Sequence, residues 1–192
     1  MSTQATPPPA APKRTAMWKK LLLLFALMVV AFLALVMTQP NEFRVSRAAT
    51  MAAPPAAVFD QVNDFHKWKD WSPWEKLDPN MKRTIEGPPA GKGASYAWNG
   101  NDDAGEGKMT ILESVPNEKI AIKLEFIRPF PSEAVIEFAF KPESGGTAAT
   151  WTMSGKNNFL SKAMCLFMNM DSMIGPDFEK GLASIKGIVE KK

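Results

Sequence analysis

Residues 64–79 read DFHKWKDWSPWEKLDP. The stretch holds three of the six tryptophans, Trp68, Trp71 and Trp74, within seven positions, together with the only histidine, His66. Each tryptophan side chain can bury about 150–250 Å². Such a cluster predicts either a plug that fills one end of a core or the rim of an apolar pocket.

The spacing of the aromatic residues also predicts local structure. Phe65, Trp68 and Trp71 recur every three residues, which places them on one side of a short helix or 3₁₀ segment. The residue after Trp71 precedes a proline, and such a residue avoids the α region. We therefore expect the helical turn to end near Trp71 and Trp74 to lie on a bend that faces back.

The N-terminal region predicts a membrane anchor. Residues 1–16 are rich in Pro, Ala and Thr without apolar periodicity, which is typical of a disordered tail. Residues 21–37, LLLLFALMVVAFLALVM, contain no polar or charged side chain and span roughly 25 Å as a helix. A cleaved signal peptide is the alternative, but it has a shorter apolar core and small residues before the cut. We expect a transmembrane helix over residues 17–38.

Flanking charge predicts the orientation of this helix. Four basic residues precede the apolar run, and only Arg44 and Arg47 follow it closely. The positive-inside rule places the N-terminus in the cytoplasm and residues 39–192 on the outer side. In a bacterium, the chain would be a single-pass inner-membrane protein whose domain lies in the periplasm.

Charge balance and rare residues argue against several classes of protein. The chain carries 23 basic and 20 acidic residues; residues 1–38 hold four of the basic ones and no acidic one, which leaves 19 against 20 in the remainder. A near-neutral domain has no electrostatic footprint for nucleic acid. The single cysteine, Cys165, and single histidine provide neither an intrachain disulfide nor a His/Cys zinc site. We expect no metal and no cofactor.

Beyond residue 42 the pattern predicts a sheet. A loosely alternating segment at 42–51 is followed by a short helix that starts at Pro54-Pro55 and has Val58, Phe59 and Val62 as its apolar stripe. After the tryptophan stretch, strands are expected between turn formers at 81–86, 94–99, 108–115, 119–127, 133–141 and 147–154. The last four are joined by short loops, which favours an antiparallel meander.

The C-terminal residues predict a helix that covers this sheet. In 171–189 the apolar residues Ile174, Phe178, Leu182, Ile185 and Val189 recur at helical spacing. A Gly-Pro pair at 175–176 should mark a kink or the true start of the helix. The glycine at 181, on the flank of the stripe, permits close approach to another surface. A sheet with one apolar face needs such a cover.

The order of strand, two short helices, six strands and long helix resembles the helix-grip fold of the START-like superfamily, also called SRPBCC. The superfamily groups polyketide cyclase/dehydrase-like, lipid-transfer and plant hydrophobic-ligand-binding proteins. The resemblance covers about residues 42–190 and is carried by Phe65, Trp68, WSPW at 71–74, GKGA at 91–94, GEG at 105–107, MTI at 109–111, Trp151 and FEKGL at 178–182. It implies an α+β domain over 42–192, with a curved antiparallel seven-stranded sheet wrapped around the C-terminal helix.

In this fold an elongated apolar cavity lies between sheet and helix, so the resemblance implies a hydrophobic small molecule or lipid as ligand. The residues expected to contact it are Trp68, Trp71, Trp74, Trp98, Phe126, Phe138, Trp151, Met173 and Phe178. The three clustered tryptophans have the alternative role of filling the gap beside the sheet. The methionines at 164, 168, 170 and 173 form no strict stripe; they would pack in the core or make a flexible wall for a lipid.

Two other functions stay open. The first is a polyketide cyclase/dehydrase-like enzyme whose acid or base would come from Glu106, Asp102, His66 or Tyr96, although no oriented pair is visible. His66 has no identifiable partner and favours an exposed or capping role, and the acidic loop at 102–106 favours a solvated turn. The second is a non-catalytic interaction module, which an exposed apolar patch would indicate.

Overall fold

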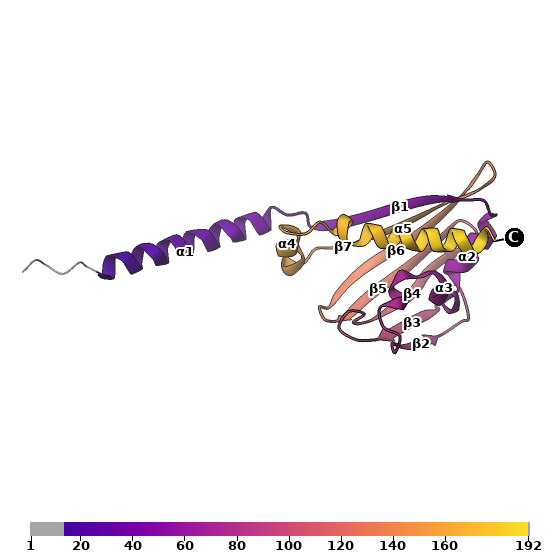
Figure 1. The fold of residues 1–192 in the computed structure, drawn as a ribbon, viewed down its shortest axis with the longest axis horizontal. Coiled ribbons are helices and arrows are strands. Elements are labelled where there is room, and N and C mark those ends of the chain that lie inside the picture. The colour runs from indigo at the N-terminus through magenta and orange to yellow at the C-terminus, as the bar shows by residue number, and fades with distance from the viewer. Residues whose placement is uncertain (1–13, 192) are drawn as a thin grey trace, which may run out of the picture. The chain divides into compact units, whose positions relative to one another are not determined.

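A single antiparallel sheet organises residues Pro40–Lys192 (Figure 1). The computed structural model describes residues 14–191 of the chain. The strands are β1 Glu42–Met51, β2 Lys82–Glu86, β3 Ser95–Asn99, β4 Glu106–Val115, β5 Lys119–Arg128, β6 Ser132–Glu143 and β7 Gly146–Lys156. All seven predicted strands are therefore present, with ends shifted by only one or two residues.

The strand order is β1-β7-β6-β5-β4-β3-β2. Strands β2 to β7 thus form one continuous meander, which extends the predicted four-strand meander by two strands. The first strand pairs with the last, in a register that runs from Glu42 opposite Lys156 to Met51 opposite Thr147. This pairing brings the segment that follows the N-terminal helix against the segment that precedes the C-terminal helix.

Short helices connect β1 to β2. Helix α2, Pro55–Asn63, begins after Pro54 and buries Val58, Phe59 and Val62 as predicted. It is followed by the 3₁₀ turn η1 Phe65–Lys67, helix α3 Trp68–Trp71 and the 3₁₀ turn η2 Pro73–Lys76. The helical turn ends at Trp71 as expected. Trp74 lies on η2 and not on a simple bend, because proline has the φ angle that starts a new helical turn.

Helix α5, Met170–Val189, covers the apolar face of the sheet and packs on β1, α2 and α3 (Figure 1). Of the two roles expected for the Gly-Pro pair, a kink or the start of the helix, the start is wrong, because Pro176 lies inside the helix. The helix begins earlier because the Asn169 side chain accepts a hydrogen bond from the Asp171 backbone N–H. Arg47 on β1 also binds the Asp171 carboxylate through two 2.8 Å hydrogen bonds, which hold the first turn against the sheet.

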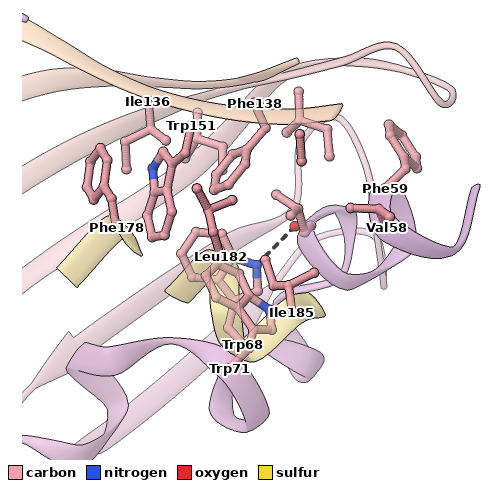
Figure 2. Close-up of a cluster of buried hydrophobic side chains, with 14 of the residues drawn as sticks. Val58, Phe59, Trp68, Trp71, Ile136, Phe138, Trp151, Phe178, Leu182 and Ile185 are labelled. Carbon is pink, nitrogen blue, oxygen red and sulfur yellow. Dashed lines mark hydrogen bonds between the residues drawn. The ribbon is translucent and has the colours of Figure 1, made fainter. Parts of the chain in front are cut away.

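Aromatic side chains dominate the core between sheet and helix (Figure 2). Trp151 on β7 stacks on Phe178 of α5, with ring centroids 4.2 Å apart and planes 7° apart. Phe138 on β6 lies on the other side, 4.8 Å from Trp151. The rings of the tryptophan stretch pack under this group, so the stretch closes one side of the core.

The N-terminal unit, Met1–Gln39, is described from residue 14. Helix α1 spans Arg14–Met37, and residues Met17–Met37 within it are long and apolar enough to cross a membrane, with mean hydropathy 2.8. A signal sequence near the N-terminus can pass the same test of length and apolar composition. The helix begins three residues before the expected boundary at 17. The rest of the predicted tail lies outside the described residues.

Candidate ligand cavity

A cavity of about 320 Å³ lies inside the helix-grip domain. It is bounded by the short helices, the sheet and α5, and its volume is at the lower end of the range of about 300–1,000 Å³ for small-molecule sites. The lining residues are Trp68, Ser72, Trp74, Glu75, Leu77, Met81, Tyr96, Trp98, Asp103, Ala104, Met109, Leu124, Phe126, Ile136, Trp151, Met153, Ile174 and Phe178. The walls are therefore mainly aromatic and aliphatic.

Hydrogen bonds and ring contacts fix the aromatic walls. The indole N–H of Trp68 donates to the Val62 carbonyl at 2.9 Å, and that of Trp98 donates to the Ala104 carbonyl at 3.0 Å. Trp98 also meets the Phe126 ring edge to face, with centroids 5.9 Å apart. Rings held in this way cannot collapse into the empty volume, which explains how an apolar cavity persists beside a packed core.

Six of the nine predicted ligand-binding residues lie on the cavity wall: Trp68, Trp74, Trp98, Phe126, Trp151 and Phe178. For these six, ligand contact stays a prediction. The tryptophan cluster divides between its two expected roles, because Trp68 and Trp74 line the cavity while Trp71 fills core space. Trp71 packs 4.6 Å from Trp68 and donates its indole N–H to the Gln61 carbonyl at 2.9 Å.

The other two predicted residues lie elsewhere. Phe138 is fully buried behind Trp151, and Met173 is 44% exposed on α5. None of the four methionines of the predicted flexible wall lines the cavity. Met81, Met109 and Met153 line it instead. Sequence reasoning missed them because each lies in or next to a strand, where an apolar residue is expected on one face of the sheet in any case.

One polar cluster faces the cavity. The Tyr96 hydroxyl donates to Glu75 Oε1, and Arg83 Nε donates to Glu75 Oε2 at 2.6 Å. The Glu75 side chain is only 7% exposed, so the guanidinium compensates a carboxylate that is nearly removed from water. Burial raises the pKa of the Tyr96 phenol above its usual value of 10.0, and the hydrogen bond to Glu75 raises it further. The hydrogen bond to Glu75 also raises the pKa of Arg83.

Of this cluster, sequence reasoning named only Tyr96. Glu75 lies within the tryptophan stretch, and Arg83 lies on β2, whose register places it opposite Trp98 and two residues from the partner of Tyr96. The only sequence signal was that Tyr96 is the single tyrosine of the chain.

Two of the remaining acid–base candidates, His66 and Glu106, contact partners outside the cavity wall. Asp64 accepts hydrogen bonds from the backbone N–H and from Nδ1 of His66, each at 2.8 Å, and the His66 side chain is 58% exposed. His66 therefore belongs to a local cap. Glu106 pairs with Arg128 at 3.3 Å. Neither His66 nor Glu106 lines the cavity.

The acidic loop after β3 is a turn. The Asn101 side chain accepts hydrogen bonds from the N–H groups of Asp103 and Ala104, both at 3.0 Å, and the Asp102 side chain is fully exposed. Asp103 contributes to the cavity wall. In residues 14–191 there is no cluster of three or more His, Cys, Asp or Glu that could hold a metal ion.

Comparison with known proteins identifies the family. Residues 42–190 match the model of the family described as polyketide cyclase / dehydrase and lipid transport, and the chain belongs to this family. Its SRPBCC helix-grip domain is the one that the sequence resemblance implied. No curated protein matches the chain.

Solved structures share the fold at low identity. Protein CV1439 from Chromobacterium violaceum is 18% identical, with a TM-score of 0.56 over 80% of this chain and 99% of its own. The di-domain ARO/CYC BexL from the BE-7585A biosynthetic pathway is 15% identical, with a TM-score of 0.59 over 83% of this chain and 53% of its own. Ara h 8.0201 is 13% identical, with a TM-score of 0.52 over 77% of this chain and 97% of its own.

The match to CV1439 covers 99% of that protein but only 80% of this chain. Residues Pro40–Lys192 also form their own compact unit with their own core. The domain can therefore be produced and studied without α1.

Proposed function

We propose that residues Pro40–Lys192 bind a small hydrophobic molecule or a single lipid chain in the cavity. The observation that carries this proposal is a cavity of about 320 Å³ whose aromatic walls are held by hydrogen bonds and ring contacts within the domain. Apolar burial at about 25 cal/mol per Å² would drive binding. The Glu75–Tyr96–Arg83 cluster supplies the few polar groups that orient a ligand in such sites.

The cavity volume limits the size of the ligand. A volume of about 320 Å³ equals that of about ten water molecules at about 30 Å³ each. That is the size of a two-ring aromatic compound or of part of one acyl chain. A whole two-chain phospholipid does not fit in this form of the cavity.

Ligand extraction combined with a cavity-filling variant tests this function. The purified domain is extracted with organic solvent for mass spectrometry, and 1-naphthol binding is measured by calorimetry. Ile174→Trp places a larger ring on a wall residue of α5 and should weaken naphthol binding at least tenfold. Ile188→Trp is the matched control, because Ile188 is a partly buried residue of the same helix away from the lining.

Two different outcomes would count against the binding site and against the function. Naphthol binding that survives Ile174→Trp unchanged would contradict the cavity as the binding site. An empty extract together with no naphthol binding by the native domain would reject the function itself.

We further propose that α1 anchors the chain once in the bacterial inner membrane, with the N-terminus in the cytoplasm and the domain in the periplasm. The support is the apolar span Met17–Met37 and the basic residues that precede it. Alkaline phosphatase fused after the last residue should be active in cells, whereas a cytoplasmic reporter at the same point should not. Activity of the cytoplasmic reporter alone would reverse the orientation.

A polyketide cyclase/dehydrase-like enzyme is the second candidate, and the Glu75–Tyr96 contact favours it. A phenol and a carboxylate within hydrogen-bond reach of each other on a cavity wall can donate and accept a proton. The raised pKa of Tyr96 keeps its hydroxyl protonated at neutral pH, so this group would act as donor. Family membership is consistent with this chemistry.

Kinetics distinguish catalysis from binding. Incubated with a synthetic triketide thioester, the native domain should release a cyclised product, detected by mass spectrometry. Tyr96→Phe should reduce turnover at least a hundredfold while 1-naphthol still binds. No product from the native domain, or equal loss of turnover and binding, would reject the enzyme and leave the binding function.

A further inference from the structure

Helix α4, Phe159–Cys165, and the residues that follow it expose an apolar surface that the cavity does not use. Its large exposed side chains are Phe159, Leu160, Met164, Phe167 and Met168, which we call the α4 patch. Phe167 is 80% exposed and Phe159 is 54% exposed. Five large apolar side chains exposed within ten residues of the chain indicate a contact with another surface. Core packing, the default role of these methionines, does not account for it.

The α4 patch lies at one end of the sheet. Strand β7 ends at Lys156, directly before α4, and β1 begins opposite it at Glu42. Figure 1 shows α4 at the end of the sheet where β1 starts. The turn between β5 and β6 lies at the same end, because Gly155 pairs with Ala134 and Phe126 pairs with Ser132. Two further apolar side chains are exposed there, Ile127 near the end of β5 and Phe130 in the turn.

Hydrogen bonds attach α4 to the residue at which the chain enters the domain. The Asn157 backbone N–H donates to the Asn41 carbonyl at 2.8 Å, and Lys162 Nζ donates to Asn41 Oδ1 at 2.5 Å. The Asn157 side chain donates to the Pro40 carbonyl at 3.1 Å. The short segment before α5 is thus fixed to Pro40 and Asn41.

Chain length then limits the distance between α4 and the apolar helix. Three residues lie between Met37 and Asn41, and the four Cα–Cα steps that join these two residues reach about 14 Å at most. The headgroup layer on each side of a bilayer is roughly 5–8 Å thick. If α1 spans a membrane, α4 therefore stays within reach of the headgroup layer, whatever the angle between the two units.

The charge of the residues around α4 also favours a lipid bilayer as the partner. Residues 156–170 contain two lysines, Lys156 and Lys162, and no acidic residue. Bilayers with anionic headgroups attract basic side chains near their surface, while exposed Phe, Leu and Met side chains enter the boundary between headgroups and acyl chains. An apolar surface flanked by lysines suits a lipid interface.

We propose that the α4 patch docks on the bilayer surface and forms a second membrane contact beside α1. This inference rests on the proposed anchor for its location. Met153 and Ile174, which line the cavity, belong to β7 and α5, the two elements that α4 joins.

Vesicle flotation of the domain without α1 tests the α4 patch alone. Residues Pro40–Lys192 should float with mixed phosphatidylcholine–phosphatidylglycerol vesicles. The double variant Phe159→Ser/Phe167→Ser should partition at least tenfold more weakly, because two large side chains lose their burial in lipid. Leu112→Ser/Val135→Ser is the control. It removes two other exposed apolar side chains from β4 and β6 and should partition within twofold of the native domain.

Further measurements distinguish the alternatives. All four substitutions are at exposed positions, and a thermal melt verifies that each variant is folded. A native domain that does not float, or an α4 variant that floats like the native domain, would overturn the proposal. The proposal would also be overturned by a second pattern of results. In that pattern the native domain is a dimer in light scattering and does not bind vesicles, and the α4 variant is a monomer. Calorimetry with 1-naphthol in solution, which the α4 variant should retain, tests the cavity separately.

Discussion

Gly181 on α5 lies directly against the indole ring of Trp151 on β7. A Cβ atom at position 181 would be 2.7 Å from Trp151 Cζ3, closer than real Cβ contacts come. The ring cannot retreat, because Phe178 stacks on it with a centroid separation of 4.2 Å. The expectation that this glycine permits close approach is confirmed, and the surface it approaches is the sheet.

Gly181→Ala should destabilise the domain. Overpacking costs about 1–3 kcal/mol, while replacing glycine within a helix gains about 1 kcal/mol, so a net loss of about 1 kcal/mol is expected. Gly187→Ala on the same helix is the control. A Cβ at position 187 meets nothing within 4 Å, so this variant should be more stable than the native domain. Urea unfolding measures both, and equal stabilisation of the two variants would contradict the close contact.

Two tryptophans of the cavity wall should respond differently to replacement by phenylalanine. The Trp68 N–H is bonded to the Val62 carbonyl, whereas the buried Trp151 N–H has no partner among the described residues. Trp68→Phe leaves a buried carbonyl unsatisfied, which costs about 1–3 kcal/mol beyond the lost ring volume. Trp151→Phe loses no hydrogen bond. The free energy of unfolding should therefore fall further for Trp68→Phe, and the reverse order would contradict the assigned hydrogen bond.

The single tyrosine allows its ionisation to be followed directly. Burial and Glu75 raise the pKa of Tyr96, so tyrosinate absorbance should appear well above pH 10.0 in the folded domain and near pH 10.0 in urea. Because the folded pKa is raised, the stabilising contribution is fully present below pH 10 and is lost as the pH rises through the folded pKa. Glu75→Gln should lower the titration midpoint. Ionisation near pH 10.0 in the folded native domain would contradict the buried cluster.

Acid stability should depend on Asp171. The hydrogen bonds from Arg47 lower the pKa of Asp171 below its usual value of 3.8. A lowered folded pKa stabilises the domain above pH 3.8, and this contribution is lost as the pH falls through the folded pKa. The melting temperature of Asp171→Asn should thus fall less than that of the native domain between neutral pH and pH values below 3.8.

Asp177→Asn is the control for this measurement, because Asp177 pairs with Lys180 on its own helix and not with the sheet. It should show the same fall in melting temperature as the native domain. An Asp171→Asn variant with an undiminished fall would contradict the assigned role of the Arg47 contact.

Local sequence patterns predicted the fold because the apolar residues of each helix or strand recur at the spacing typical of that element. The alternation in 119–127 and the stripe from Ile174 to Val189 need no knowledge of distant residues. The helical stripe predicted the start of α5 to within one residue, and only the alternative that the Gly-Pro pair starts the helix is wrong, because Asn169 and the Arg47–Asp171 contact stabilise a first turn before Pro176. One of these two determinants comes from a strand more than a hundred residues away.

The candidate site was predictable only in its aromatic part. A cluster of tryptophans is visible in the sequence, and two of its three members line the cavity. The contact of Glu75 with Arg83 and Tyr96 depends on the register of β2 against β3 and on the position of η2. Nothing in the local sequence distinguishes Glu75 from the exposed acidic residues, so sequence reasoning missed it.

The pairing of β1 with β7 has a consequence for biosynthesis. Glu42–Met51 leaves the ribosome about a hundred residues before its partner Gly146–Lys156. Until then β1 is an unpaired edge directly after the apolar helix, and a nascent chain that stops before Gly146 cannot complete the sheet. The domain therefore folds only after nearly all of it has been synthesised, and the unpaired strand is exposed to proteases and chaperones during that interval.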